Sequence, residues 1–319
     1  MSFSLSTRWN ASRHRDGARM IDEIRELGFA TVELGHDLRA DLVPGVRQAV
    51  SASVVRVGSV HNFCPVPLGY VRGSPDLYSP CATDTLEQEA AVRNTRRTVE
   101  FAADVGAEWV VLHGGRVEMA DRTGKMIGRY LQGDRPGAGV YDKLRMRQLM
   151  EREKKGIRHL ALLRQFIETM LPHAEKLGCR LAIEIQPMWE SVPTELELFD
   201  LLTEFKDSGL RYWHDFGHGQ IRENLGFINH RRWLERLQPF LAGMHIHDVV
   251  APAQDHLAPG MGDMDFTVFT EIAGRTKARV LEPHPETTAD DLTNGVRQLR
   301  QQWADAIAAP RSEGSCASS

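Results

Sequence analysis

The sequence predicts an α/β fold in which eight parallel strands alternate with helices and close into a (β/α)8 barrel. Eight short apolar runs alternate with segments of helical spacing, and 319 residues suit a single barrel with insertions. Barrel strands deliver active-site residues at their C-terminal ends. Six of the runs end in a histidine, an aspartate or a glutamate: VRVGSVH at His61, WVVLH at His113, LAIE at Glu184, LRYWHD at Asp215, LAGMHIHD at Asp248 and ARVLE at Glu282.

Composition limits the classes of protein that the chain can represent. Hydrophobic residues make up 42% and charged residues 26%, as in an ordinary soluble protein. The formal net charge of -4 argues against a general electrostatic grip on nucleic acid. The N-terminus lacks the apolar segment of a secretory signal, and no apolar run is long enough to span a membrane. A reduced, cytoplasmic setting is expected, because no CxxC pair occurs among the cysteines Cys64, Cys81, Cys179 and Cys316.

The first half of the chain holds four expected strands and three expected helices. The strands cover 3–9, 29–34, 54–61 and 109–113, and the helices cover 16–27, 42–53 and 84–105. Met20 and Ile24 keep helical spacing in the first helix, and Gly28 is placed to end it. Asp84 is the expected N-cap of the third helix, with Glu87 as its capping-box partner.

The second half completes the alternation. Strands are expected over 180–185, 210–214, 241–248 and 278–281, and helices over 142–177, 193–207, 231–237, 266–273 and 289–308. Gly178 is placed as the C-cap of the longest helix, and Pro193 with Thr194 opens the next one. Because no linker divides the chain, residues 1–309 are expected to form one domain, followed by a disordered tail at 310–319.

Two segments depart from regular spacing. The irregular loop over 62–82 is long enough to suggest a functional role. An inserted loop is expected at about 116–143, and residues 116–155 carry 11 Lys and Arg against 6 Asp and Glu. For the helical part we expect a solvated charged face, which is the usual explanation of a charge run. For the loop we expect a lid that contacts an anionic or polyhydroxylated substrate.

The strand-end residues are carboxylates and imidazoles, which are the side chains expected to bind a divalent metal ion. Alternation places His245 and His247 on one face of their strand, with Ile246 on the other. Asp248 points with the opposite face and is expected to support the loop, although it could instead hold His247. A single strand-end histidine or glutamate is more often a hydrogen-bonded rim residue. Several carboxylates in one barrel mouth would repel one another, and a divalent cation such as zinc, manganese or cobalt would offset that repulsion. The expected mouth residues are Glu33, His61, His113, Glu184, Asp215, His218, His245, His247 and Glu282.

These residues lie in motifs that resemble a known family. The motifs are LAIE at 181–184, WHDFGH at 213–218, GMHIHD at 243–248, DHLAPGMGDMDF at 255–266 and VLE at 280–282. Together they resemble the xylose-isomerase-like TIM-barrel superfamily over residues 3–308. That superfamily includes sugar isomerases and epimerases, inosose dehydratases and endonucleases of the endonuclease IV type.

The resemblance implies roles for individual residues. The metal ligands it implies are Glu184, Asp215, His245 and Glu282. Glu184 and Glu282 would also move the proton in an epimerase, with His218 or His247 assisting on oxygen. His61 and His113 match the ligands of a further zinc in the endonucleases, and in sugar-acting relatives these positions face the substrate.

The third zinc of the endonucleases is matched only in part. His218 and His256 match two of its ligands, but Gln254 stands where those enzymes have an aspartate, with Asp255 one place away. This departure argues against a complete trinuclear nuclease site. Glu33 and Trp189 are expected to contact substrate, although Trp189 could equally form a wall of the barrel.

The expected function is that of a metal-dependent isomerase or epimerase of a small sugar or polyol. A sugar dehydratase or lyase on the same site is the nearest alternative. A phosphodiesterase acting on abasic DNA and a non-catalytic sugar-binding barrel are the others. The expected partners are a small sugar and a second copy in a homo-oligomer, with no membrane and no nucleic acid.

Overall fold

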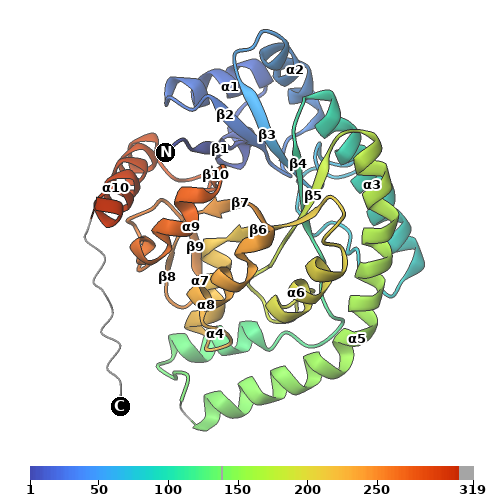
Figure 1. The fold of residues 1–319 in the computed structure, drawn as a ribbon, viewed down its shortest axis with the longest axis vertical. Coiled ribbons are helices and arrows are strands. Elements are labelled where there is room, and N and C mark those ends of the chain that lie inside the picture. The colour runs from blue at the N-terminus through green and yellow to red at the C-terminus, as the bar shows by residue number, and fades with distance from the viewer. Residues whose placement is uncertain (138, 309–319) are drawn as a thin grey trace.

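A computed structural model describes residues 1–137 and 139–308, and eight parallel strands in it form a closed barrel (Figure 1). Their order around the barrel is β1-β10-β7-β6-β5-β4-β3-β2. The strands are β1 (Ser4–Ser6), β2 (Thr31–Leu34), β3 (Arg56–His61), β4 (Trp109–His113), β5 (Arg180–Glu184), β6 (Leu210–Asp215), β7 (Leu241–Ile246) and β10 (Ala278–Leu281). The predicted (β/α)8 barrel is confirmed. The tail expected at 310–319 lies outside the described residues.

Helices surround the barrel (Figure 1). They are α1 (Gly17–Glu26), α2 (Val43–Ser51), α3 (Thr85–Asp104), α5 (Gly139–Lys176), α6 (Glu195–Glu204), α8 (His230–Leu237), α9 (Thr270–Arg275) and α10 (Ala289–Ala308). Asp84 caps α3 as predicted, since its side chain accepts a hydrogen bond from the Glu87 amide. The side chain of Glu87 does not complete the capping box. It accepts instead from the amide of Ser79, in the loop before the helix.

The core has two layers because strand side chains alternate between the barrel interior and the helices. Inside the barrel, Trp109 and Trp213 pack with Val111, Ala182 and Val280. Outside it, aliphatic side chains of the strands pack against the buried faces of the helices. This packing fixes the strand ends, and therefore the side chains that follow them.

Two predicted strands end at least two residues before the expected position. The first ends at Ser6, because Thr7–Trp9 turn into a short 3-10 helix capped by the Ser6 side chain. The strand expected over 241–248 ends at Ile246. Asp248 instead begins β8 (Asp248–Val250), which pairs antiparallel with β9 (Gln254–Leu257) in a small hairpin above the barrel. The hairpin brings residues of the predicted DHLAPG motif back over the strand ends.

The insertion is largely helical, where a loop was expected. It contains α4 (Thr123–Leu131), and α5 already begins at Gly139, so the two helices form an arm that extends beyond the barrel (Figure 1). Buried Glu190 fixes the start of α4 by accepting hydrogen bonds from the amides of Arg122 and Thr123. An apolar cluster joins the arm to α7 (Phe216–Asn224) and β8, through Met126, Tyr141, Ile221, Leu225 and Val249. The helix α7 follows β6 directly and was not predicted.

Three of the four cysteines can be placed. Cys64, Cys81 and Cys179 are buried and form no disulfide among the described residues. Burial raises the pKa of the Cys81 thiol to about 11, and hydrogen bonding from Ser79 offsets this only in part. No helix in residues 1–137 and 139–308 is both long and apolar enough to cross a membrane.

Candidate metal centre

The C-terminal ends of four neighbouring strands bring the four predicted ligands together. Glu184 ends β5, Asp215 ends β6, His245 lies near the end of β7, and Glu282 follows β10. The Nδ1 atom of His245 is 3.3 Å from Oε2 of Glu184, 3.7 Å from Oδ2 of Asp215 and 3.6 Å from Oε2 of Glu282. All four side chains are buried. One imidazole nitrogen therefore faces three carboxylates from three other strands.

The orientation of His245 fits a divalent metal ion. Its Nε2 atom lies 3.0 Å from Oε1 of Glu33, and Glu33 in turn accepts a hydrogen bond of 2.7 Å from the Ser59 hydroxyl. A histidine that donates one ring N–H to a carboxylate presents the lone pair of its other nitrogen. That other nitrogen, Nδ1, is buried and has no hydrogen-bond partner in the part of the chain that the structure describes. Ligand atoms on one ion lie about 3 to 3.6 Å apart, close to the distances found here.

The electrostatics of the centre are compatible with a bound cation. Burial opposes ionisation of Glu184, but His245, His113 and His218 outweigh it and hold its pKa well below the ordinary range. Burial likewise opposes protonation of His245, but Glu33, Glu282 and Glu184 raise its pKa well above that of a free imidazole. Without a metal ion, the carboxylates thus attract protons to the histidines. A divalent ion at Nδ1 of His245 would take over this role.

His61 and His113 lie on the Glu184 side of the centre. Nδ1 of His61 is 2.9 Å from the Asn62 carbonyl, so it carries the proton, and Nε2 is 3.1 Å from Oε2 of Glu184. A neutral His61 would aim a lone pair at the carboxylate, which requires a proton or a cation between them. Nδ1 of His113 is 2.9 Å from Asp76, and its Nε2 is 3.6 Å from Glu184. Burial opposes protonation of His113, but Asp76 and Glu184 raise its pKa to about 10.

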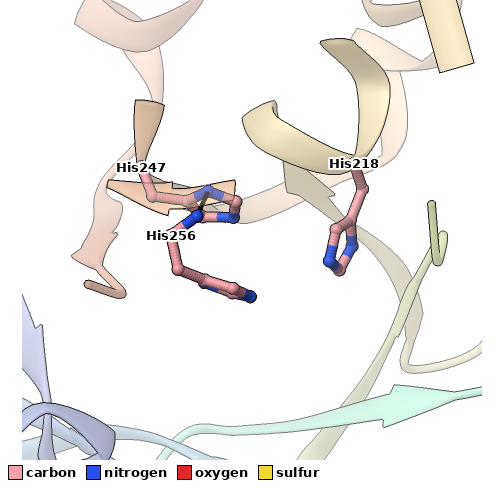
Figure 2. A group of neighbouring side chains, drawn as sticks. All are labelled: His218, His247 and His256. Carbon is pink, nitrogen blue, oxygen red and sulfur yellow. Dashed lines mark hydrogen bonds between the residues drawn. The ribbon is translucent and has the colours of Figure 1, made fainter. Parts of the chain in front are cut away.

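His218, His247 and His256 form a cluster on the Asp215 side (Figure 2). His247 places Nε2 3.0 Å from Asp215, and its Nδ1 accepts a 2.9 Å hydrogen bond from the His256 amide, drawn as the dashed line in Figure 2. The rings of His247 and His256 stack with centroids 4.0 Å apart. His247, and not Asp255, thus completes the group of three. Gln254 is exposed and takes no part in it.

The hydrogen bonds that hold His247 differ from expectation in one respect. Asp248 was considered as a support for His247, but His247 is held by Asp215 and by the His256 amide instead. The carboxylate of Asp248 accepts hydrogen bonds from the amides of Val249, Gly260 and Met264. It therefore stabilises the loop after β8, which agrees with the expectation that it points away from the ligands.

Arg8 limits what His256 can bind. The Nδ1 atom of His256 is 2.9 Å from the Glu282 carbonyl, which can only accept, so this nitrogen carries the proton. The lone pair of Nε2 then accepts from the guanidinium of Arg8 at 2.7 Å. His256 has no lone pair left for a metal ion in this arrangement. Sequence reasoning missed Arg8, although it follows β1 as the ligands follow their strands.

The two residues expected to contact substrate have other positions. Glu33 is fully buried and its carboxylate contacts His245, so in this structure it supports that histidine. Trp189 is half-buried and stacks on Phe227 with centroids 4.5 Å apart, which makes it part of the wall beside the arm. Asp76, which contacts His113, and Gln186, which donates a hydrogen bond to Asp76, were also missed, because they lie in loops without a periodic pattern.

The fold and the motifs agree with a known family. The family model described as xylose isomerase-like TIM barrel matches residues 21–302. The chain belongs to this family. No curated protein matches the sequence.

Several solved structures share this xylose isomerase-like barrel at low sequence identity. A D-tagatose 3-epimerase-like protein has a TM-score of 0.68 and 16% identity, covering 97% of this chain and 99% of its own. A 3-keto-D-glucoside 4-epimerase from E. coli has a TM-score of 0.65 and 16% identity, covering 94% and 99%. An L-ribulose 3-epimerase has a TM-score of 0.63 and 15% identity, covering 98% and 100%. The likeness extends over the whole barrel and establishes the fold.

Proposed function

We propose that this xylose isomerase-like barrel is a divalent-metal-dependent isomerase or epimerase of a small ketose or keto-sugar. The observation that carries the proposal is the unpartnered Nδ1 atom of His245, which faces Glu184, Asp215 and Glu282. A manganese, cobalt or zinc ion held by these four side chains would polarise a carbonyl and acidify the neighbouring C–H bond.

The two glutamates are suited to move the proton. Glu184 and Glu282 come from β5 and β10, which are separated in the barrel by β6 and β7. They therefore reach the substrate position from different sides. Glu184 removes the proton on one side of the substrate carbon, and Glu282 returns it on the other, which inverts that carbon.

His218 is suited to assist on oxygen. Its Nδ1 atom is 3.0 Å from the Ile185 carbonyl and 3.1 Å from Oε1 of Glu184. Burial opposes its protonation, but Asp215 and Glu184 raise its pKa to about 9. A protonated His218 can donate its remaining N–H to a substrate hydroxyl or to the oxygen of the carbonyl.

The similar structures support the choice of substrate. The three described above are named as epimerases or epimerase-like proteins, and their names refer to a ketose or to a keto derivative of a glucoside. In such sugars, a metal ion that binds the carbonyl oxygen would acidify the C–H bond of the carbon next to that carbonyl. Epimerisation at that carbon is therefore the reaction proposed.

An abasic-site phosphodiesterase is the second candidate. The observation in its favour is that His61 and His113 both approach Glu184, as ligands of a further ion would. Two observations argue against it. Arg8 takes up the lone pair of His256, and the net charge of the chain is acidic. We therefore rank it below the sugar epimerase.

The test is solvent deuterium exchange. The protein loaded with manganese is incubated in D2O with a panel of ketoses and keto-sugars, and incorporation is followed by NMR. We expect exchange at the carbon next to the carbonyl, and its loss in Glu184→Gln but not in the surface control Glu235→Gln. If no exchange occurs across the panel and the protein nicks an abasic duplex when zinc is present, the epimerase assignment is wrong and the nuclease assignment takes its place.

A further inference from the structure

A cavity opens at the N-terminal end of the barrel, where the strands begin, opposite the candidate metal centre. It has a volume of about 660 Å³. Five cationic side chains and one carboxylate line it: Arg56, Arg180, Arg211, Arg275, Lys277 and Glu108. The cations come from separate elements. Three lie on β3, β5 and β6, Arg275 ends α9, and Lys277 lies between α9 and β10. This concentration of positive charge contrasts with the acidic chain as a whole.

Most of this charge has no counterpart in the protein. Arg180 pairs with Glu108 at 3.2 Å, and Arg275 pairs with Glu271 at 2.6 Å. Among the described residues, Arg56, Arg211 and Lys277 have no carboxylate within ion-pair distance. A concave site lined by one sign of charge concentrates the field and attracts ions of the other sign.

The cavity is also partly preorganised. The guanidinium of Arg211 is held by the carbonyls of Ser208 and Leu210 at 3.0 and 2.7 Å. Trp109, whose ring lies 5.6 Å from the Arg180 guanidinium, closes the barrel interior behind the cations, with Ala242 and Ala278 beside it. Arginines held in one place lose less conformational freedom when they bind an anion.

We propose that this N-terminal cavity binds a small phosphorylated molecule that carries a diphosphate group. The binding would not depend on the metal centre or on the reaction proposed for it. Three of the lining cations, Arg56, Arg211 and Lys277, have no carboxylate partner among the described residues. One phosphate carries only about -1.5 to -2 at neutral pH, so two linked phosphates match these three charges better. Arginine forks are suited to several phosphate oxygens at once.

The test is calorimetric titration with inorganic pyrophosphate. Chelator-treated protein is used, so that pyrophosphate cannot bind through an ion at the metal centre. The variant Arg56→Glu/Lys277→Glu reverses two exposed cations that have no carboxylate partner, and both positions should tolerate the change. The matched control Lys154→Glu/Arg158→Glu makes the same change of net charge on an exposed face of α5. Thermal unfolding of each protein checks that it is folded.

We expect pyrophosphate to bind the unmodified protein and the α5 control with equal affinity. Its affinity for the cavity variant should be lower by a factor of about ten or more, because charge-assisted hydrogen bonds are lost. Affinity should also fall as salt is added. Undetectable binding to the unmodified protein, or equal weakening in both variants, would overturn the proposal. Orthophosphate that binds as tightly as pyrophosphate would overturn the assignment of a diphosphate group.

Discussion

The carboxylate of Glu33 lies 3.0 Å from Nε2 of His245 and determines which nitrogen of that ring faces the metal centre. Glu33 is itself fixed by the hydroxyl of Ser59, from the neighbouring strand β3. A chain of two hydrogen bonds thus runs from the barrel wall to the four candidate ligands. The position of the Nδ1 lone pair thus depends on Glu33, a residue outside the four candidate ligands.

Glu33→Gln should weaken metal binding. Loss of the charged partner lowers the basicity of the His245 ring, and changes of this kind reduce metal affinity by about 10- to 100-fold. Calorimetric titration with manganese measures the effect. Ser59→Ala, which removes only the outer hydrogen bond, should have a smaller effect in the same direction. Unchanged affinity in Glu33→Gln would show that His245 is not a ligand through Nδ1.

A metal ion should stabilise the fold, and Asp215→Asn should abolish that gain. Binding to the native state at 100 times Kd contributes about 2.7 kcal/mol to the free energy of unfolding. Asparagine can still accept the hydrogen bond from the His218 amide that starts α7, so the variant should fold. Scanning calorimetry with manganese and with chelator gives the comparison, and exposed Asp207→Asn is the control. Equal stabilisation of both variants would exclude Asp215 as a ligand.

Gly217→Ala should displace His247. A Cβ atom at this position would lie 2.0 Å from Cε1 of His247, so the imidazole must move away from Asp215. We expect loss of most activity in the deuterium-exchange assay. Gly128→Ala is the matched control, because its Cβ atom would meet nothing within 4 Å and alanine favours a helix by about 1 kcal/mol over glycine. Full activity of Gly217→Ala would show that His247 is dispensable.

Acidification below neutral pH should destabilise the protein through His230. Burial lowers the pKa of this imidazole to about 3, and Asp215 opposes the shift only weakly. In the unfolded chain His230 takes up a proton near its ordinary pKa of about 6.5, whereas in the folded chain it does not. The unfolded state therefore binds more protons in this range, and stability falls as the pH drops from about 6.5 towards 3.

Urea unfolding at several pH values measures this dependence. One such histidine contributes up to about 1.4 kcal/mol per pH unit, and His230→Gln should flatten the slope by that amount. His214 contacts His230 and shares the depressed pKa, so part of the slope should remain. Exposed His284→Gln should leave the slope unchanged. An unaltered slope in His230→Gln would contradict the assignment.

The strand ends were predictable because they depend on local sequence. Short apolar runs alternate with amphipathic segments, and a ligand that ends a run must lie at the C-terminal mouth of a parallel barrel. This reasoning placed Glu184, Asp215, His245 and Glu282 at the barrel mouth among other strand-end residues, and the resemblance to the family then selected these four as ligands. It did not foresee the contact of Glu33 with His245, because that contact depends on the pairing of β1 with β2 and β10.

The parts that were missed depend on contacts between distant loops. Helix α7 starts in a run that reads as the end of a strand, and its N-cap is Asp215 itself. The hairpin of β8 and β9 is too short to give a periodic signal. The arm was expected to begin as a loop because its glycines suggested one, yet Glu190, from 67 residues further along the chain, caps α4.

The position of Glu282 after the last barrel strand has a consequence for biosynthesis. β10 pairs with both β1 and β7, so it is the strand that closes the barrel. During translation the other three candidate ligands leave the ribosome earlier, but the set stays incomplete until residue 282 has emerged and β10 has docked. A metal ion held as proposed would therefore find its complete set of ligands only after the ring of strands has closed.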